Sequence, residues 1–83
     1  MRSVSYSKSA LKVLRKMPRP AALRIMEKVD QFARAPESLA NNVKRLQGSD
    51  FIRLRVGDWR VIMDDQGAVL AVLRIGSRGS VYE

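Results

Sequence analysis

The sequence contains neither cysteine nor histidine in its 83 residues. Without cysteine there is no disulfide framework and no thiol chemistry. Because zinc sites are built mostly from these two residue types, we expect no metal site, and nothing in the sequence calls for a cofactor. The missing histidines also exclude acid–base catalysis by imidazole. Any catalysis by this chain must therefore rely on other side chains.

Long apolar segments are missing as well. The opening "MRSVSYSKSA" lacks the apolar core of a signal peptide, and no run of about 18 apolar residues follows. With only five glycines and three prolines, the chain shows no linker and no internal repeat. We expect residues 1–83 to form a single small domain that is soluble, cytoplasmic and without a membrane partner.

Positive charge is what the chain has in excess. Sixteen Lys and Arg residues stand against eight Asp and Glu, which gives a net charge of +8, while 46% of the residues are hydrophobic. Such a globular and strongly basic chain is typical of proteins with a polyanionic partner. Residues 1–50 hold eleven basic and four acidic side chains, so most of this charge lies in the first part of the sequence.

The first 35 residues predict a strand and a helical hairpin. The alternation in "RSVSYS" favours a strand, and Ser7 or Ser9 can cap the helix that follows. "MPRP" ends this first helix, since proline cannot continue its hydrogen bonding. Pro36 closes the second helix. The apolar positions recur at helical spacing and are Ala10, Leu11, Val13, Leu14 and Met17, then Ala22, Ile25, Met26, Val29, Phe32 and Ala33.

The second part of the sequence predicts a three-stranded meander. Residues 36–50 are irregular, with room for a short helical turn. Strands are expected at 51–56, 59–64 and 68–75, and a tail ends the chain within the unit 51–83. The order β-α-α-β-β-β indicates an α+β fold in which the helical hairpin packs on one face of a mainly antiparallel, four-stranded sheet.

The segment "FIRLRVGDWRVIM" places three arginines on one face of a hairpin. A two-residue turn at Gly57-Asp58 puts Arg55 directly opposite Arg60, and Arg53 shares their face. Like charges at this spacing destabilise a sheet by up to about 1 kcal/mol, so we interpret the face as an anion site. The alternative is a solvated surface whose long side chains splay apart. Arg74 cannot be assigned, because moving the "DQG" turn by one residue changes its face.

Other catalytic patterns are absent from the sequence. Asp64 and Asp65 lie in a predicted turn, where aspartate commonly makes local hydrogen bonds. "IGSRGS" lacks the lysine and the following helix of a phosphate-binding loop. What remains is the group of arginines and Tyr82. Arginine forks fit phosphate oxygens and can stabilise a pentacovalent phosphorane, while Tyr82 can stack on a base or exchange a proton. The pattern indicates a surface that handles phosphodiesters.

These residues resemble a known family. "LRVGDWRVIM" followed by "AVLRIGSRGSVYE" is similar to the C-terminal half of RelE/ParE-superfamily toxins of bacterial toxin–antitoxin pairs, and the helical hairpin fits as well. The resemblance covers essentially the whole chain. The hairpin sequence is fairly specific for the superfamily. It is much less specific for the cellular target on which a member acts. RelE-like members cut mRNA in the ribosomal A site, whereas ParE-like members poison DNA gyrase.

The resemblance implies roles for individual residues. Arg60, Arg78 and Tyr82 are expected to be catalytic, and Arg53 and Arg55 to bind RNA. Arg74 is not among the residues that the resemblance covers, and we expect it to bind RNA as well. Two departures from the family stand out. Many members have histidine where Ser77 stands here, and some have lysines where this chain has Phe51 and Arg53. The general-base roles proposed for those lysines therefore have no equivalent in this sequence.

We expect a RelE-like toxin, a ribosome-dependent and metal-independent mRNA endonuclease that uses the adjacent 2′-OH. The alternatives are a ParE-like gyrase inhibitor without nuclease activity and a degenerate member kept for complex formation. The partners implied are a cognate antitoxin, the ribosome and mRNA, with operator DNA reached only through the antitoxin. A second basic surface for partner docking is expected on the helical hairpin, at Lys8, Lys12, Arg15, Lys16, Arg19 and Arg24.

Overall fold

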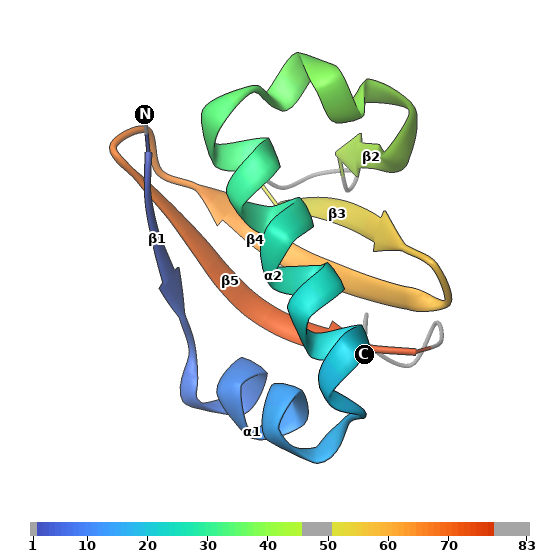
Figure 1. Cartoon of the computed structure of the whole chain (residues 1–83). Helices are drawn as coiled ribbons and strands as arrows, with labels where there is room; N and C mark the ends of the chain where they lie inside the picture. The colour runs from blue at the N-terminus through green and yellow to red at the C-terminus, as the bar shows by residue number, and fades with distance from the viewer. Residues whose placement is uncertain (1, 46–50, 78–83) are drawn as a thin grey trace.

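The computed structural model describes residues 2–45 and 51–77, which form a sheet with helices on one face (Figure 1). In chain order the elements are β1 (Ser3–Tyr6), α1 (Lys8–Lys16), α2 (Arg19–Arg34), the 3₁₀ helix η1 (Pro36–Asn42), β2 (Val43–Arg45), β3 (Phe51–Val56), β4 (Trp59–Asp65) and β5 (Val69–Gly76). The strand order across the sheet is β1-β5-β4-β3-β2. In this described sheet, β1 and β5 are parallel and the other neighbouring pairs are antiparallel. The α+β class and the mainly antiparallel sheet are confirmed.

The described sheet has five strands and not the four that were predicted. The additional strand is β2, which pairs with β3 in antiparallel register from Val43 opposite Leu54 to Arg45 opposite Ile52. A strand of three residues is too short for an alternating pattern to be recognised in a sequence. The helical turn expected between residues 36 and 50 is η1, which leads directly into β2.

Helix α1 begins where the sequence predicts and is tied to the sheet at its N-terminal cap. The Ser7 side-chain oxygen accepts a hydrogen bond from the Ala10 backbone N–H at 3.0 Å, which caps the helix. The same hydroxyl donates to the Leu73 carbonyl oxygen at 2.7 Å. Helix α2 then runs across the sheet, while α1 lies at one end of β1 and β5 (Figure 1).

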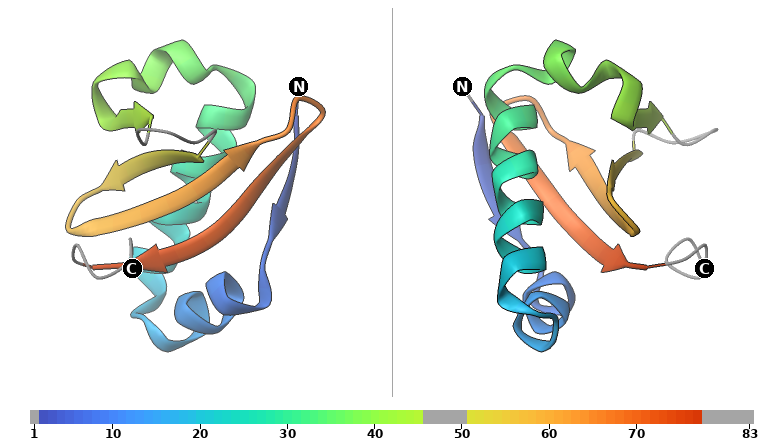
Figure 2. Two further views of the ribbon diagram at one scale, coloured as in Figure 1. Left: turned by 180° about the vertical axis from the view of Figure 1, so that it is seen from behind. Right: turned by 45° about the vertical axis from the view of Figure 1, so that its right-hand side comes forward.

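The core fills the space between the helices and one face of the sheet. Helix α2 contributes the fully buried Ile25 and Val29, and the strands that it covers contribute most of the rest (Figure 2). The buried strand residues of this cluster are Ile52, Leu54, Val56, Val61, Met63, Leu70, Val72 and Ile75. Leu11 and Met26, which helical spacing assigns to the apolar stripes, are 37% and 40% exposed, because each stripe is wider than the surface that covers it.

A bulge in β5 changes which side chains face the core. Val72 pairs with Met63, but Arg74 pairs with Ile62, so Leu73 is an extra residue between the two pairs. Strict alternation from Val72 would direct Arg74 to the core. With the bulge, Val72 and Ile75 are both buried on the core face, and Arg74 is exposed on the other face.

Candidate functional site

Four arginines lie on the sheet face that no described helix covers. Seen from behind, β3, β4 and β5 lie in front of α2, and no described helix crosses them (Figure 2). Arg55 lies directly opposite Arg60, as the hairpin sequence predicts. Arg53 is opposite Ile62, and Ile62 is in turn opposite Arg74. The structure therefore brings Arg53, Arg55, Arg60 and Arg74 together, and we call this surface the arginine face.

The register of the arginine face is set by the tight turn between β3 and β4. Gly57 has φ of 59°, and no described residue other than glycine has a positive φ. A positive φ at the first of the two central residues is the type II′ pattern, which matches the twist of the flanking strands. The guanidinium of Arg24 reaches this turn from α2, since a Cβ at Gly57 would lie 3.8 Å from its Nη1.

The side chains of the arginine face differ in how far they are exposed. Arg55 and Arg74 are exposed, whereas Arg53 and Arg60 are partly buried. Ile62 is only 5% exposed although it lies outside the main core cluster. Its two cross-strand neighbours are Arg53, whose Nε atom is itself buried, and Arg74, whose side chain is exposed. Arg60 Nη1 donates a hydrogen bond to the Ser77 carbonyl at 3.4 Å.

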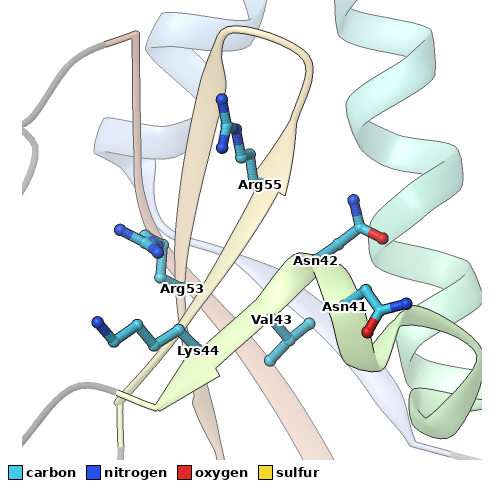
Figure 3. Close-up of a pocket in the computed structure, with 6 residues that line it drawn as sticks. All are labelled: Asn41, Asn42, Val43, Lys44, Arg53 and Arg55. Atoms are coloured by element: carbon cyan, nitrogen blue, oxygen red, sulfur yellow. The ribbon is translucent and has the colours of Figure 1, made fainter.

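A hollow of about 300 Å³ adjoins the arginine face beside β2. Its lining residues are Asn41, Asn42, Val43, Lys44, Arg53 and Arg55 (Figure 3). Lys44 is opposite Arg53 in the β2–β3 ladder, and in Figure 3 the two side chains project to the same side. The cross-strand row is therefore Lys44–Arg53–Ile62–Arg74. Sequence reasoning missed Lys44, because the three-residue strand that carries it is too short to show a pattern.

Phe51 also belongs to this surface, as the alternation of β3 predicts, although it is not among the predicted site residues. It belongs to the same side of β3 as Arg53 and Arg55, and it is 40% exposed. The other aromatic residues of the described strands, Tyr6 and Trp59, pack against the core cluster. Burial and the negative charge of Asp30 raise the pKa of Tyr6 to about 12, so its phenol stays neutral in ordinary conditions.

The carboxylates near the sheet have structural partners. Asp65 Oδ1 accepts hydrogen bonds from Arg2 Nε at 2.9 Å and from the Gly67 N–H at 3.0 Å, and Asp64 Oδ2 accepts from Gln66. Partial burial acts to raise the pKa of Asp65, but these hydrogen bonds and the charges of Arg2 and Arg45 outweigh it and hold the pKa below its ordinary value. Among the described residues, no three acidic side chains gather to hold a metal ion.

The predicted docking residues on the helices lie on a different surface. All six side chains are exposed, on the helical side of the sheet, at Lys8, Lys12, Arg15, Lys16, Arg19 and Arg24. Arg78 and Tyr82, predicted to be catalytic, lie outside the residues that the structure describes. None of the helices in the described part of the chain is long and apolar enough to cross a bilayer.

Comparison with solved structures identifies proteins of the same fold. The RelE–RelB complex of the archaeon Pyrococcus horikoshii contains a chain with a TM-score of 0.78 and 28% identity, covering 94% of this chain and 96% of that one. A mutant of the Escherichia coli toxin RelE, solved in the free state, gives a TM-score of 0.78 at 22% identity, covering 98% and 90%. Escherichia coli YafQ gives 0.74 at 17% identity, covering both chains fully.

Curated protein sequences include no match to this chain. The family model described as the ParE toxin of the type II toxin–antitoxin system parDE matches residues 4–82, nearly the entire sequence. The match spans the helical hairpin, the hairpin of β3 and β4, and the arginine face. This chain belongs to the family of ParE toxins of type II toxin–antitoxin systems, within the RelE/ParE superfamily.

Proposed function

We propose that this toxin is a ribosome-dependent mRNA endonuclease that inhibits translation in the cytoplasm. The observation that carries the proposal is the arginine face, where Arg55 and Arg60 lie opposite each other in the hairpin of β3 and β4, on the side that no described helix covers. A stable sheet gains nothing from this pair, whereas a phosphate between the two guanidiniums would remove their repulsion. The 28% identical archaeal chain from the RelE–RelB complex supports the RelE-like assignment.

The proposed reaction needs no metal or cofactor. The 2′-oxygen attacks the adjacent phosphorus, and the bond from phosphorus to the 5′-oxygen of the next nucleotide breaks, which leaves a 2′,3′-cyclic phosphate and a 5′-hydroxyl. The 2′-OH gives up a proton, and the leaving oxygen takes one. Arg60 and Arg78 stabilise the charge that develops on the phosphorane, since arginine stays protonated. Tyr82 is the titratable residue to which we assign proton exchange, because the chain has no imidazole.

The partners proposed are the ribosome with its mRNA and a cognate antitoxin. The similar chains of Pyrococcus horikoshii, Methanococcus jannaschii and Escherichia coli were solved in complexes of RelE with RelB. By analogy, an antitoxin would neutralise this toxin, and contact with operator DNA would come only through that antitoxin. Arg53, Arg55 and Arg74 would bind the RNA backbone in this reading.

The test is cleavage of mRNA on purified ribosomes by single-arginine variants. Arg60→Ala and Arg78→Ala are each expected to lower the cleavage rate by about 10²–10³-fold, the usual effect of removing a transition-state donor. Arg34→Ala, at the exposed end of α2, is the matched control and should cleave like the wild type. Circular dichroism would check that all three variants are folded. Wild-type cleavage by Arg60→Ala and Arg78→Ala would refute the site assignment.

A ParE-like gyrase inhibitor without nuclease activity is the second candidate, and the family model that matches residues 4–82 favours it. The two candidates predict different first events after induction of the gene. An mRNA endonuclease stops translation first and leaves new mRNA 5′ ends in register with codons. A gyrase inhibitor instead raises the DNA-damage response first and leaves the mRNA ends unchanged.

A further inference from the structure

We propose that Phe51 and Lys44 form a nucleotide subsite beside the scissile phosphate, in which Phe51 stacks on an unpaired base and Lys44, with Arg53, holds the neighbouring phosphate. The proposal rests on the function proposed above. It states which part of the RNA, one base and its neighbouring phosphate, would bind on this side of the arginine face. Neither Phe51 nor Lys44 is among the site residues predicted from the sequence.

The first observation is the position of an accessible aromatic ring beside fixed cations. Phe51 is 40% exposed, and its side chain is on the same side of β3 as that of Arg53, two residues along the strand. Two residues of a strand span about 6.5–7 Å, a distance that one nucleotide can bridge. Single exposed apolar residues are common, as Leu23 on α2 illustrates at 51%. Phe51 differs because it is the aromatic side chain of the described arginine face.

The second observation is the arrangement of charge on the two sides of Phe51. Across the sheet, Phe51 is opposite Asp64, whose carboxylate would repel a phosphate. Along β3 it is followed by Arg53, which is itself opposite Lys44. The phosphate of a bound nucleotide is therefore directed toward Lys44 and Arg53, and the uncharged base is left over Phe51. An aromatic ring beside a basic groove is the usual arrangement for binding single-stranded nucleic acid.

The third observation is the space beside Lys44. The hollow of about 300 Å³ is lined by Lys44, Arg53 and Arg55 on its cationic side and by Asn42 on the other (Figure 3). In the β2–β3 register, Val43 is opposite Leu54, so the next position brings Asn42 beside Arg55. A volume of this size is at the lower end of small-molecule sites and exceeds what a single anion fills. It suits a phosphate together with its ribose.

The test uses equilibrium binding of a fluorescently labelled 2′-O-methyl hexanucleotide to the purified full-length toxin, measured by anisotropy. The methyl group prevents cleavage, so the assay does not depend on catalysis. Phe51→Leu, which keeps apolar bulk and loses the ring, should weaken binding by about tenfold, and Phe51→Trp should bind at least as tightly as the wild type. Leu23→Ala removes a similar exposed apolar surface from α2 and is expected to bind like the wild type.

The same oligonucleotide with abasic positions separates stacking from a general loss of affinity. Phe51→Leu should bind the abasic strand as tightly as the wild-type toxin does. Lys44→Ala should weaken binding of both strands and lower the slope of log affinity against log salt by about 0.7, the value for one phosphate contact with a single strand. Arg34→Ala, at the exposed end of α2, is the control for loss of one charge.

Three results would overturn the subsite. In the first, Phe51→Leu binds the base-containing strand as tightly as the wild type. In the second, Phe51→Leu loses the same affinity for the base-containing and the abasic strand. In the third, the wild-type toxin shows no measurable binding at low salt. They are distinct from failure of the proposed function, which is read from cleavage by Arg60→Ala. If that variant cleaves normally while Phe51→Leu still loses affinity, the stacking site stands and the catalytic assignment falls.

Discussion

At the scale of single residues, the arginine face places like charges opposite each other and has a buried apolar residue between two of its arginines. Arg55 and Arg60 are directly opposite, a pairing that costs up to about 1 kcal/mol in a sheet. Between Arg53 and Arg74, Ile62 is buried to 5% exposure on the side away from the helices. An apolar residue in the middle of the cations limits how closely the guanidiniums approach one another. The two flanking arginines differ in exposure, because Arg53 is partly buried together with its Nε atom and Arg74 is exposed.

The ion pair between Arg2 and Asp65 leads to a prediction about pH. Its two side chains are 28% and 22% exposed, so its contribution to the free energy of unfolding should be about 0.5–1 kcal/mol. The pKa of Asp65 is lowered in the folded state. Its stabilisation is therefore fully present above the ordinary pKa of about 4 and is lost as the pH falls through the lowered value.

We expect Asp65→Asn to lower the free energy of unfolding at pH 7 and to lower it by less at about pH 2, because the wild-type carboxylate takes up a proton as the pH falls. Urea denaturation at the two pH values would measure both differences. Asp58→Asn, at the exposed turn, controls for loss of one carboxylate. An equal destabilisation by Asp65→Asn at both pH values would mean that the ion pair is not its cause.

At the scale of elements, prediction succeeded where the pattern extends over many residues and failed where it is short or interrupted. The two helices follow from helical spacing, and the hairpin of β3 and β4 follows from alternation around Gly57. A serine cap was predicted at Ser7 or Ser9, and Ser7 is the cap. Strand β2 was missed because three residues show no period, and with it Lys44 was missed. The face of Arg74 depends on a bulge, which leaves no mark in the residue types.

The turn between β3 and β4 yields a prediction about stability. Gly57 has φ of 59°, a region that costs residues with a Cβ roughly 1–2 kcal/mol. A Cβ there meets nothing nearer than 3.8 Å, so the backbone conformation alone should decide the effect. Gly57→Ala is expected to lower the urea midpoint by an amount equivalent to about 1 kcal/mol with an unchanged m value, and Gly57→Asn should be milder. Equal stability of Gly57→Ala and the wild type would contradict the turn conformation.

At the scale of the whole molecule, basic side chains gather on two sides of the described sheet. The arginine face lies on one side and the basic helical surface on the other (Figure 2). Two separate basic surfaces would allow the toxin to bind its proposed RNA substrate on one side and an acidic antitoxin on the other. The helical surface also carries the exposed apolar side chains of Leu23 and Met26, on α2.

We expect the antitoxin to be acidic where it docks and to cover the arginine face, the helical surface or both. Complementary charge mainly raises the association rate constant and makes it fall with salt. Arg55→Glu reverses one charge on the arginine face, and Lys12→Glu reverses one on the helical surface. The substitution that lies in the interface should lower the association rate constant, and this decrease should be smaller at high salt. Hydrogen–deuterium exchange of the complex would show which strands and helices become protected. Protection of neither surface would refute this prediction.

The bulge at Leu73 divides β5 into two halves with opposite alternation. Before it, even-numbered residues such as Leu70 and Val72 face the core, and after it the odd-numbered Ile75 does. Deleting Leu73 would restore regular pairing and leave Arg74 opposite Ile62, at the cost of the hydrogen bond from Ser7. Deleting Ala71 instead would shift one half of the strand against both neighbours. Deletion of Leu73, the residue at the bulge, should therefore lower the thermal stability less than deletion of Ala71. The bulge is the point in β5 where the chain can best tolerate a change of length.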